Sequence, residues 1–133
     1  MNVMPELNVL VVDDEPAVRQ VLAAALSKAG YAVDSAASAA EALARLDKAP
    51  VDVVLSDVFM PVTDGIELLR QARARGHAAT FIMVTAFASV DSAIEAIKAG
   101  AWDYITKPVR NEEILHRLEQ IDALRSLRED NRA

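Results

Sequence analysis

The sequence predicts an α/β protein built on a doubly wound, five-stranded parallel sheet. Apolar runs of strand length alternate along the chain with segments whose apolar residues recur at helical spacing, which is the pattern of a parallel sheet covered by helices on both faces. The chain has 133 residues, 53% of them hydrophobic, and only 4 glycines and 5 prolines. It therefore has the size and composition of one folded domain.

Five apolar runs are predicted to form the strands, with right-handed connections between them. The first and third runs are nearly continuously aliphatic, which is typical of strands buried on both faces in the middle of a sheet. The second contains Asp34, and the fifth is short and lies between Asp103 and Lys107, so both are predicted to be edge strands. The five runs are residues 7–12, 31–35, 51–56, 80–85 and 104–106.

The intervening segments carry the start and stop signals of helices. The first helix, residues 15–29, has one apolar face and is followed by Gly30, a common residue just past a helix end. A capping box at residues 38–41 opens the second helix, and Asp64 with Glu67 opens the third.

The last two helices are predicted to turn their apolar residues toward the sheet. The fourth begins near Ser89 and stops at Gly100, and the fifth has Asn111 as its cap and can run to about residue 129. The inward residues are Val90, Ala93, Ile94 and Ile97 in the fourth helix and Ile114, Leu118, Ile121 and Leu124 in the fifth.

Charge and composition exclude several classes of function. With 20 acidic and 14 basic residues the net charge is −6 at pH 7, so no direct binding to nucleic acid or anionic lipid is expected. The absence of cysteine excludes a disulfide framework and a thiolate metal site. No uncharged run approaches the roughly 20 residues of a membrane span, and no signal peptide is recognisable, so a cytoplasmic location is expected.

Polar side chains follow or end four of the predicted strands. Asp13 and Asp14 follow the first run, Asp57 follows the third, Thr85 ends the fourth and Lys107 follows the fifth. The carboxyl ends of parallel strands meet at one edge of the sheet, where doubly wound folds bind their ligands. Each residue alone has an ordinary explanation as a helix cap, a β-former or a loop residue, but their joint placement favours one shared site.

Such a site has a definite chemistry. Carboxylates held close together repel one another, so the site needs a proton or a cation. Oxygen ligands without histidine or cysteine favour Mg²⁺, or Mn²⁺, over zinc. A carboxylate beside the ion can act as a nucleophile toward a phosphoryl group and form an acyl phosphate. Lys107 would pair with the phosphoryl oxygens, and Thr85 would donate a hydrogen bond to one of them.

Four motifs, in this order, resemble the receiver domain of bacterial two-component response regulators. They are residues 10–15 (LVVDDE), residues 56–61 (SDVFMP) with Asp64-Gly65, residues 84–86 (VTA), and residues 103–108 (DYITKP). The resemblance implies a flavodoxin-like sheet in the strand order 2-1-3-4-5 with five helices. It also implies a receiver domain over residues 7–124, with residues 125–133 extending the last helix toward an output domain outside this sequence.

The resemblance implies a role for each residue of the acidic cluster. Asp57 is the expected phosphoacceptor, taking the phosphoryl group from a phosphohistidine on a sensor histidine kinase. Asp13, Asp14 and Asp57 are the expected Mg²⁺ ligands, together with the backbone carbonyl of Phe59.

The resemblance also implies how the arrival of phosphate is transmitted. Lys107 and Thr85 are expected to contact the phosphoryl group, and Tyr104 matches the aromatic switch that turns inward when Thr85 moves, although an aromatic residue on an edge strand is also an ordinary packing residue. The Lys107-Pro108 peptide is expected to be cis. The switch would change the face formed by the fourth helix, fifth strand and fifth helix, through which the chain would bind its output domain, a downstream protein or a second copy as a homodimer.

Two phenylalanines flank the expected phosphate. Phe59 and Phe87 lie two residues beyond Asp57 and Thr85, at positions that influence the lifetime of the phosphate in this family. Two bulky apolar side chains there predict slow self-dephosphorylation, because they hinder the attacking water. The alternative is that they only cover the edge of the sheet.

Two other functions are alternatives to the phosphorylation switch. A Mg²⁺-dependent aspartyl-nucleophile phosphatase of the haloacid-dehalogenase type usually needs a second Asp two positions after the nucleophile, where this chain has Phe59. A phosphate-independent receiver used only as a binding module is disfavoured by the complete set of site residues. The prediction is therefore a signalling domain and not an enzyme. Residues 88–108 are similar to receivers that precede an ATPase and a DNA-binding domain, which indicates a transcription regulator.

Overall fold

The computed structural model describes residues 7–131 as five strands that alternate with five helices. Every strand lies within two residues of its predicted position. The strands are β1 (Asn8–Val12), β2 (Ala32–Ala36), β3 (Val53–Asp57), β4 (Thr80–Thr85) and β5 (Asp103–Thr106). The helices are α1 (Pro16–Lys28), α2 (Ala39–Lys48), α3 (Gly65–Ala74), α4 (Val90–Ala99) and α5 (Asn111–Asn131).

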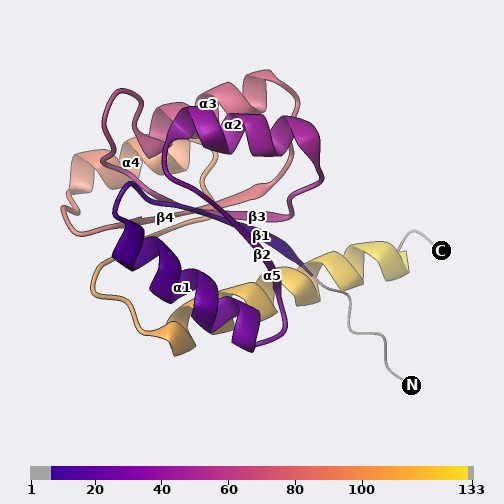
Figure 1. Cartoon of the computed structure of the whole chain (residues 1–133). Coiled ribbons are helices and arrows are strands. Elements are labelled where there is room, and N and C mark those ends of the chain that lie inside the picture. The colour runs from indigo at the N-terminus through magenta and orange to yellow at the C-terminus, as the bar shows by residue number, and fades with distance from the viewer. Residues whose placement is uncertain (1–6, 132–133) are drawn as a thin grey trace.

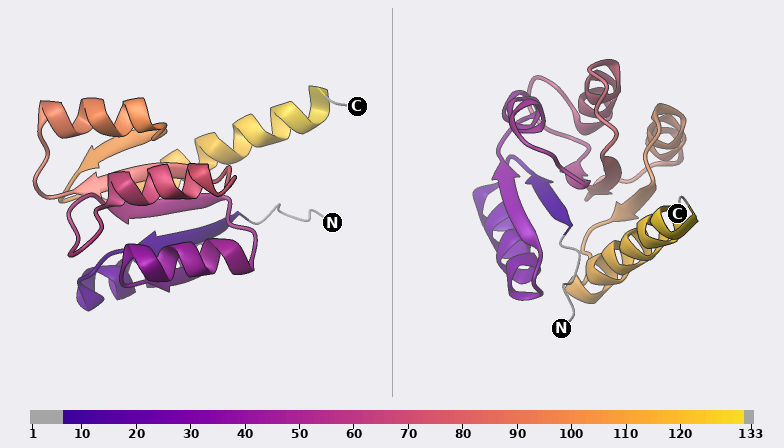
Figure 2. Two further views of the ribbon diagram at one scale, coloured as in Figure 1. Left: turned by 90° about the horizontal axis from the view of Figure 1, so that it is seen from above. Right: turned by 90° about the vertical axis from the view of Figure 1, so that its right-hand side faces the viewer.

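The five strands form one parallel sheet in the order β2-β1-β3-β4-β5. The predicted fold class and strand order are therefore confirmed, with β2 and β5 at the edges. Helices α1 and α5 cover one face of the sheet, and α2, α3 and α4 cover the other (Figure 1). The sheet is thus the middle of three layers, as Figure 2 shows when the strands are seen from their ends.

The aliphatic runs of β1 and β3 are buried on both faces of the sheet. Val9 and Val11 pack into the core beneath α1 and α5, and Leu10 and Val12 pack into the core beneath α2, α3 and α4. All four are at most 2% exposed. Because helices cover both faces, a shift of β1 would disrupt packing on both sides of the sheet, which helps to keep its carboxyl end in place.

Three of the helices begin with the caps that the sequence predicts. The side chains of Ser38, Asp64 and Ser89 each accept a hydrogen bond from a backbone amide in the first turn of α2, α3 and α4. At the other end of α4, Gly100 adopts a left-handed conformation with φ of 109°, which a residue with a side chain rarely adopts. These caps set where each helix enters and leaves the loops around the site.

The prediction for α4 is wrong in one respect, because its large apolar residues face outward. Val90, Ile94 and Ile97 are 75%, 48% and 53% exposed, whereas Ala96 is fully buried. Helical periodicity identifies an apolar stripe but not the face that meets the sheet. Here the small residues of α4, Ala96 above all, lie against the core and let the helix approach closely.

Helix α5 buries apolar residues in its first half. Ile114, Leu118 and Ile121 are at most 3% exposed, as predicted, but Leu124 is 50% exposed. The C-terminal part of α5 extends beyond the sheet (Figure 2). The helix starts one residue earlier than its predicted cap requires, since Asn111 is already its first residue.

A membrane span can be tested within the described part of the chain. Among residues 7–131, no helix combines the length and the apolar character that crossing a bilayer requires.

Candidate functional site

Three carboxylates gather at the carboxyl edge of the sheet. Asp13 and Asp14 come directly after β1, and Asp57 is the last residue of β3, which pairs with β1. A carboxylate oxygen from each of the three lies within 4.8 Å of the others. Asp13 is 4% exposed and Asp14 is exposed, so the cluster is a shallow pocket with one open side.

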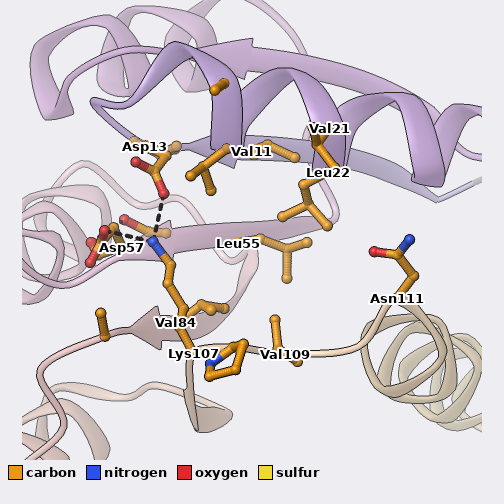
Figure 3. Close-up of a pocket in the computed structure, with 16 residues that line it drawn as sticks. Val11, Asp13, Val21, Leu22, Leu55, Asp57, Val84, Lys107, Val109 and Asn111 are labelled. Carbon is orange, nitrogen blue, oxygen red and sulfur yellow. Dashed lines mark hydrogen bonds and ion pairs between the residues drawn. The ribbon is translucent and has the colours of Figure 1, made fainter.

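Lys107 bridges two of these carboxylates. Its Nζ donates hydrogen bonds of 3.0 Å to Oδ2 of Asp13 and 3.0 Å to Oδ2 of Asp57, reaching across from the segment after β5 (Figure 3). Burial of the ammonium acts to lower its pKa, but the hydrogen bonds and charges of Asp13 and Asp57 outweigh burial, so the pKa of Lys107 is raised above its ordinary value. The lysine is therefore a fixed positive charge in this pocket at physiological pH.

Local hydrogen bonds hold the two buried carboxylates in place. The Glu15 amide donates to Oδ1 of Asp13 at 2.9 Å, and the Phe59 amide donates to Oδ1 of Asp57 at 3.2 Å. Each aspartate thus closes a turn with the amide two residues onward, which leaves its other oxygen for the pocket. These turns are the ordinary structural role that the sequence allowed, and the structure shows that they coexist with the shared site.

Two supporting residues were missed by the sequence reasoning. Arg19 Nη1 donates to the backbone carbonyl of Asp13 at 2.7 Å, and the buried Ser56 hydroxyl donates to the carbonyl of Asp57 at 2.9 Å. Both fasten the loop backbone rather than the carboxylates. The only available signal was their nearness in sequence to the site, because an arginine in a helix and a serine in a strand are otherwise common.

Gly65, the glycine of the Asp64-Gly65 pair, lies very close to the backbone at the end of β3. Its amide donates to the carbonyl of Val58 at 2.7 Å, and a Cβ at this position would lie 2.1 Å from the carbonyl oxygen of Asp57. Only glycine allows α3 to start this close to the backbone of the phosphoacceptor candidate.

The donor set fits a hard divalent cation. Three carboxylates supply oxygen ligands only, on a partly open pocket where water or phosphate oxygen can complete the coordination shell. In the present arrangement Lys107 supplies the compensating positive charge.

Thr85 and Tyr104, which are expected to transmit the arrival of phosphate together with Lys107, form hydrogen bonds with residues other than the three aspartates. Thr85 is fully buried, and its Oγ1 accepts a hydrogen bond from the Phe87 amide at 3.2 Å. Tyr104 is half-buried, and its hydroxyl is hydrogen-bonded to the hydroxyl of Ser92 in α4. The Lys107-Pro108 peptide is cis, as predicted.

The two flanking phenylalanines contact each other. The rings of Phe59 and Phe87 are in an edge-to-face arrangement with centroids 6.2 Å apart, although the residues are 47% and 74% exposed. The loops after β3 and β4 are thus joined by an aromatic contact beside the acidic pocket.

An apolar cleft of about 550 Å³ opens from the acidic pocket between α1 and the start of α5. Its lining includes Val11, Leu22, Leu55 and Val109, with Lys107 at its polar end (Figure 3). Apolar walls keep water away from one side of the lysine and so strengthen its two ion pairs.

A doubly wound sheet that gathers carboxylates and a lysine at its carboxyl edge defines a class of phosphoacceptor signalling domains. The family described as "Response regulator receiver domain" matches residues 9–119, and the chain belongs to this family. It is therefore a signalling domain of two-component systems, as predicted, and a cognate histidine kinase is implied as its partner.

Known relatives agree with this assignment. The transcriptional regulatory protein ResD of Bacillus subtilis is 39% identical over 116 residues, covering 87% of this chain and 48% of ResD. The transcriptional regulatory protein ZraR of Salmonella typhimurium is 40% identical over 115 residues, covering 86% of this chain and 26% of ZraR. The chain thus spans half or less of these two relatives, and they continue beyond the matched part by very different lengths.

Solved structures show the same fold. A CheY-like receiver domain protein from Methanospirillum hungatei has a TM-score of 0.85 at 33% identity, covering 91% of this chain and 98% of that one. The chemotaxis protein CheY4 of Vibrio cholerae has a TM-score of 0.83 at 36% identity, covering 87% of this chain and 98% of that one.

Proposed function

We propose that Asp57 accepts a phosphoryl group from a phosphohistidine of the cognate kinase, in a pocket where Asp13, Asp14 and Asp57, with the Phe59 carbonyl, hold Mg²⁺ or Mn²⁺. The single observation that supports this assignment is the set of three carboxylates within 4.8 Å of one another with Lys107 between them. Bound metal would neutralise the carboxylates and draw charge from the phosphoryl oxygens.

Asp57, Lys107 and Thr85 have different roles in the proposed phosphoryl transfer. A carboxylate oxygen of Asp57 attacks phosphorus, and the bond from phosphorus to the histidine nitrogen breaks, with its electron pair returning to the imidazole. Lys107, already directed at Asp57, pairs with a phosphoryl oxygen. The hydroxyl of Thr85 leaves the Phe87 amide and donates to a second phosphoryl oxygen.

The test is the intact mass of the protein after incubation with acetyl phosphate and Mg²⁺. The wild type is expected to gain one phosphoryl group and Asp57→Ala none. Asp64→Ala is the matched control, because Asp64 lies in the same loop but caps α3 through the Glu67 amide. If the wild type gains no mass with fresh donor and excess Mg²⁺, the alternative of a phosphate-independent binding module replaces this proposal.

We also propose that Phe59 and Phe87 lengthen the life of the phosphate by hindering the attacking water. Their edge-to-face contact supports this role because it joins both loops beside Asp57. Replacing both with serine is expected to speed loss of the phosphoryl group, followed by mass over time. Leu127→Ser, an exposed apolar residue at the far end of α5, is the control, and an unchanged half-life in the double variant would refute the role.

At the level of the whole protein, we propose a cytoplasmic transcription regulator in which residues 7–124 form the receiver and residues 125–133 begin a linker helix. An ATPase and a DNA-binding domain would follow, and phosphorylation would favour a homodimer. The continuation of α5 to Asn131 and the similarity to transcriptional regulatory proteins support this proposal. The length of the natural gene product tests whether output domains follow the receiver. Its mass in solution with and without phosphodonor tests whether phosphorylation favours a homodimer.

A further inference from the structure

We infer that Ser92 is a positioning residue that holds Tyr104 in the phosphate-free arrangement, through the hydrogen bond between their hydroxyl groups. This inference rests on the proposed function, because it concerns the equilibrium that phosphorylation of Asp57 shifts. Ser92 lies in α4, outside the four sequence motifs that form the site.

The contact joins the edge strand to the first turn of α4. Tyr104 lies in β5, packs against the core on the α4 side of the sheet, and places its hydroxyl against the hydroxyl of Ser92. Ser92 is held in turn by the helix cap, since Ser89 Oγ donates to Ser92 Oγ at 2.9 Å and accepts from the Ser92 amide at 3.1 Å. The tyrosine is therefore tied to the start of α4 and not only packed against it.

In the structure that contains this bond, Thr85 and Lys107 are both engaged by other groups of the chain. The hydroxyl of Thr85 is engaged by the Phe87 amide, and Lys107 is engaged by Asp13 and Asp57. Tyr104 pairs with Met83 of β4, and Thr85 lies two residues beyond Met83 on the same face of that strand. Recruitment of Thr85 to a phosphoryl oxygen would therefore open space on the face where Tyr104 lies. Movement of the ring into that space breaks the bond to Ser92.

One hydrogen bond matters here because α4 buries little apolar surface; its other described side-chain tie is the exposed ion pair between Glu95 and Arg70 of α3. Among its ten residues only Ala96 is buried, and the larger apolar residues face outward, so a shift of the helix exposes little new apolar surface. A hydrogen bond typically contributes about 0.5–1.5 kcal/mol, which corresponds to a roughly three- to tenfold change in a two-state equilibrium.

The test is a calorimetric titration with beryllofluoride in the presence of Mg²⁺, comparing four proteins in a double-mutant cycle. Ser92→Ala and Tyr104→Phe are each expected to bind roughly three- to tenfold more tightly than the wild type, since each removes the bond that opposes switching. The double variant is expected to bind no more tightly than either single variant. Ser92→Thr, which keeps a hydroxyl, is expected to restore the wild-type affinity.

Ser89→Ala is the matched control, because it removes both hydrogen bonds from the Ser89 hydroxyl to Ser92 but leaves the Tyr104 contact. It is expected to tighten binding less than Ser92→Ala does. Equal tightening by Ser89→Ala would overturn the inference in favour of a weaker helix start. Unchanged or weaker binding by Ser92→Ala, or additive effects in the cycle, would also overturn it. Failure of the wild type itself to bind beryllofluoride would refute the proposed function instead.

A second measurement needs neither metal nor phosphate analogue. In the metal-free wild type, nuclear Overhauser contacts are expected between the Tyr104 ring and the Ser92 methylene, and they are expected to weaken in Ser92→Ala relative to other contacts between β5 and α4. Absence of these contacts in the wild type would refute the positioning role.

Discussion

Val62 has a backbone conformation that its side chain disfavours. Val62 follows Pro61 in the loop after β3, its φ is 70°, and its side chain is fully exposed. A β-branched residue in the left-handed region is strained, and no packing compensates for the strain here.

Replacing Val62 with glycine is therefore expected to stabilise the protein by about 1 kcal/mol, measured by urea unfolding. Val62→Ala is the control, because alanine keeps a Cβ and should gain less. If Val62→Gly unfolds at a lower urea concentration than the wild type, the backbone at Val62 is not strained.

Gly65 is the opposite case, since a side chain there meets the backbone of Asp57. The expected cost of Gly65→Ala is about 2–3 kcal/mol in the free energy of unfolding, because the start of α3 must move away from the site. Gly76→Ala makes a useful comparison, since a Cβ at Gly76 meets no atom within 4 Å and only its φ of 87° opposes the change. A larger loss for Gly76 than for Gly65 would refute the steric explanation.

At the scale of elements, α4 is attached to the sheet by its small residues. Ile94→Gln is expected to change the free energy of unfolding by less than about 0.5 kcal/mol, because the side chain is 48% exposed. Ala96→Leu, on the buried face, is expected to cost about 1–3 kcal/mol through overpacking. Denaturant unfolding of the two variants compares the two faces of α4. A larger loss of stability for Ile94→Gln than for Ala96→Leu would mean that Ile94, and not Ala96, faces the sheet.

An ion cluster joins the C-terminal ends of α2 and α3. Asp47 accepts from His77 Nε2 at 2.7 Å and also pairs with Arg75. The hydrogen bond from His77, followed by the charge of Arg75, holds the pKa of Asp47 below its ordinary value of 3.8.

A carboxyl group whose pKa is lowered by folding stabilises the native state above its ordinary pKa and loses this contribution as pH falls through its folded pKa. The wild type is therefore expected to lose stability below about pH 4 more steeply than Asp47→Asn, in thermal unfolding at stepped pH. High salt should shrink the difference, because the group is exposed. If the wild type and Asp47→Asn lose stability equally steeply as pH falls, the cluster contributes nothing to stability.

For the whole molecule, the end of α5 contributes little to the folded domain. Leu124 and Leu127 are 50% and 58% exposed, and the last tertiary contact described is the 2.6 Å ion pair from Arg125 to Asp52. Removing residues 126–133 is expected to change the free energy of unfolding by less than about 1 kcal/mol and to leave phosphorylation unchanged. Removing Arg125 as well should cost about 0.5–1 kcal/mol more. A large loss from the shorter deletion would place the domain boundary beyond residue 124.

The sequence predicted the fold because local signals and global topology agree in this chain. Aliphatic runs, caps such as Ser38 and Asp64, and the terminal Gly100 each mark an element within a residue or two. Alternation of strands and helices then leaves few topologies. The polar residues of the site were recognisable because they interrupt apolar runs at the same end of each strand.

The orientation of side chains was decided only by the tertiary structure. Periodicity could not show that Ala96 rather than Ile94 meets the sheet, because the choice depends on how closely α4 approaches β4 and β5. Nor could it pair Tyr104 with Ser92, since that contact joins two elements whose separation is set by packing. The order of elements, the acidic pocket and the family could all be predicted from local patterns in the chain. The structure decided which faces and hydroxyl groups meet, because contacts between elements depend on distances in space that the linear pattern does not contain.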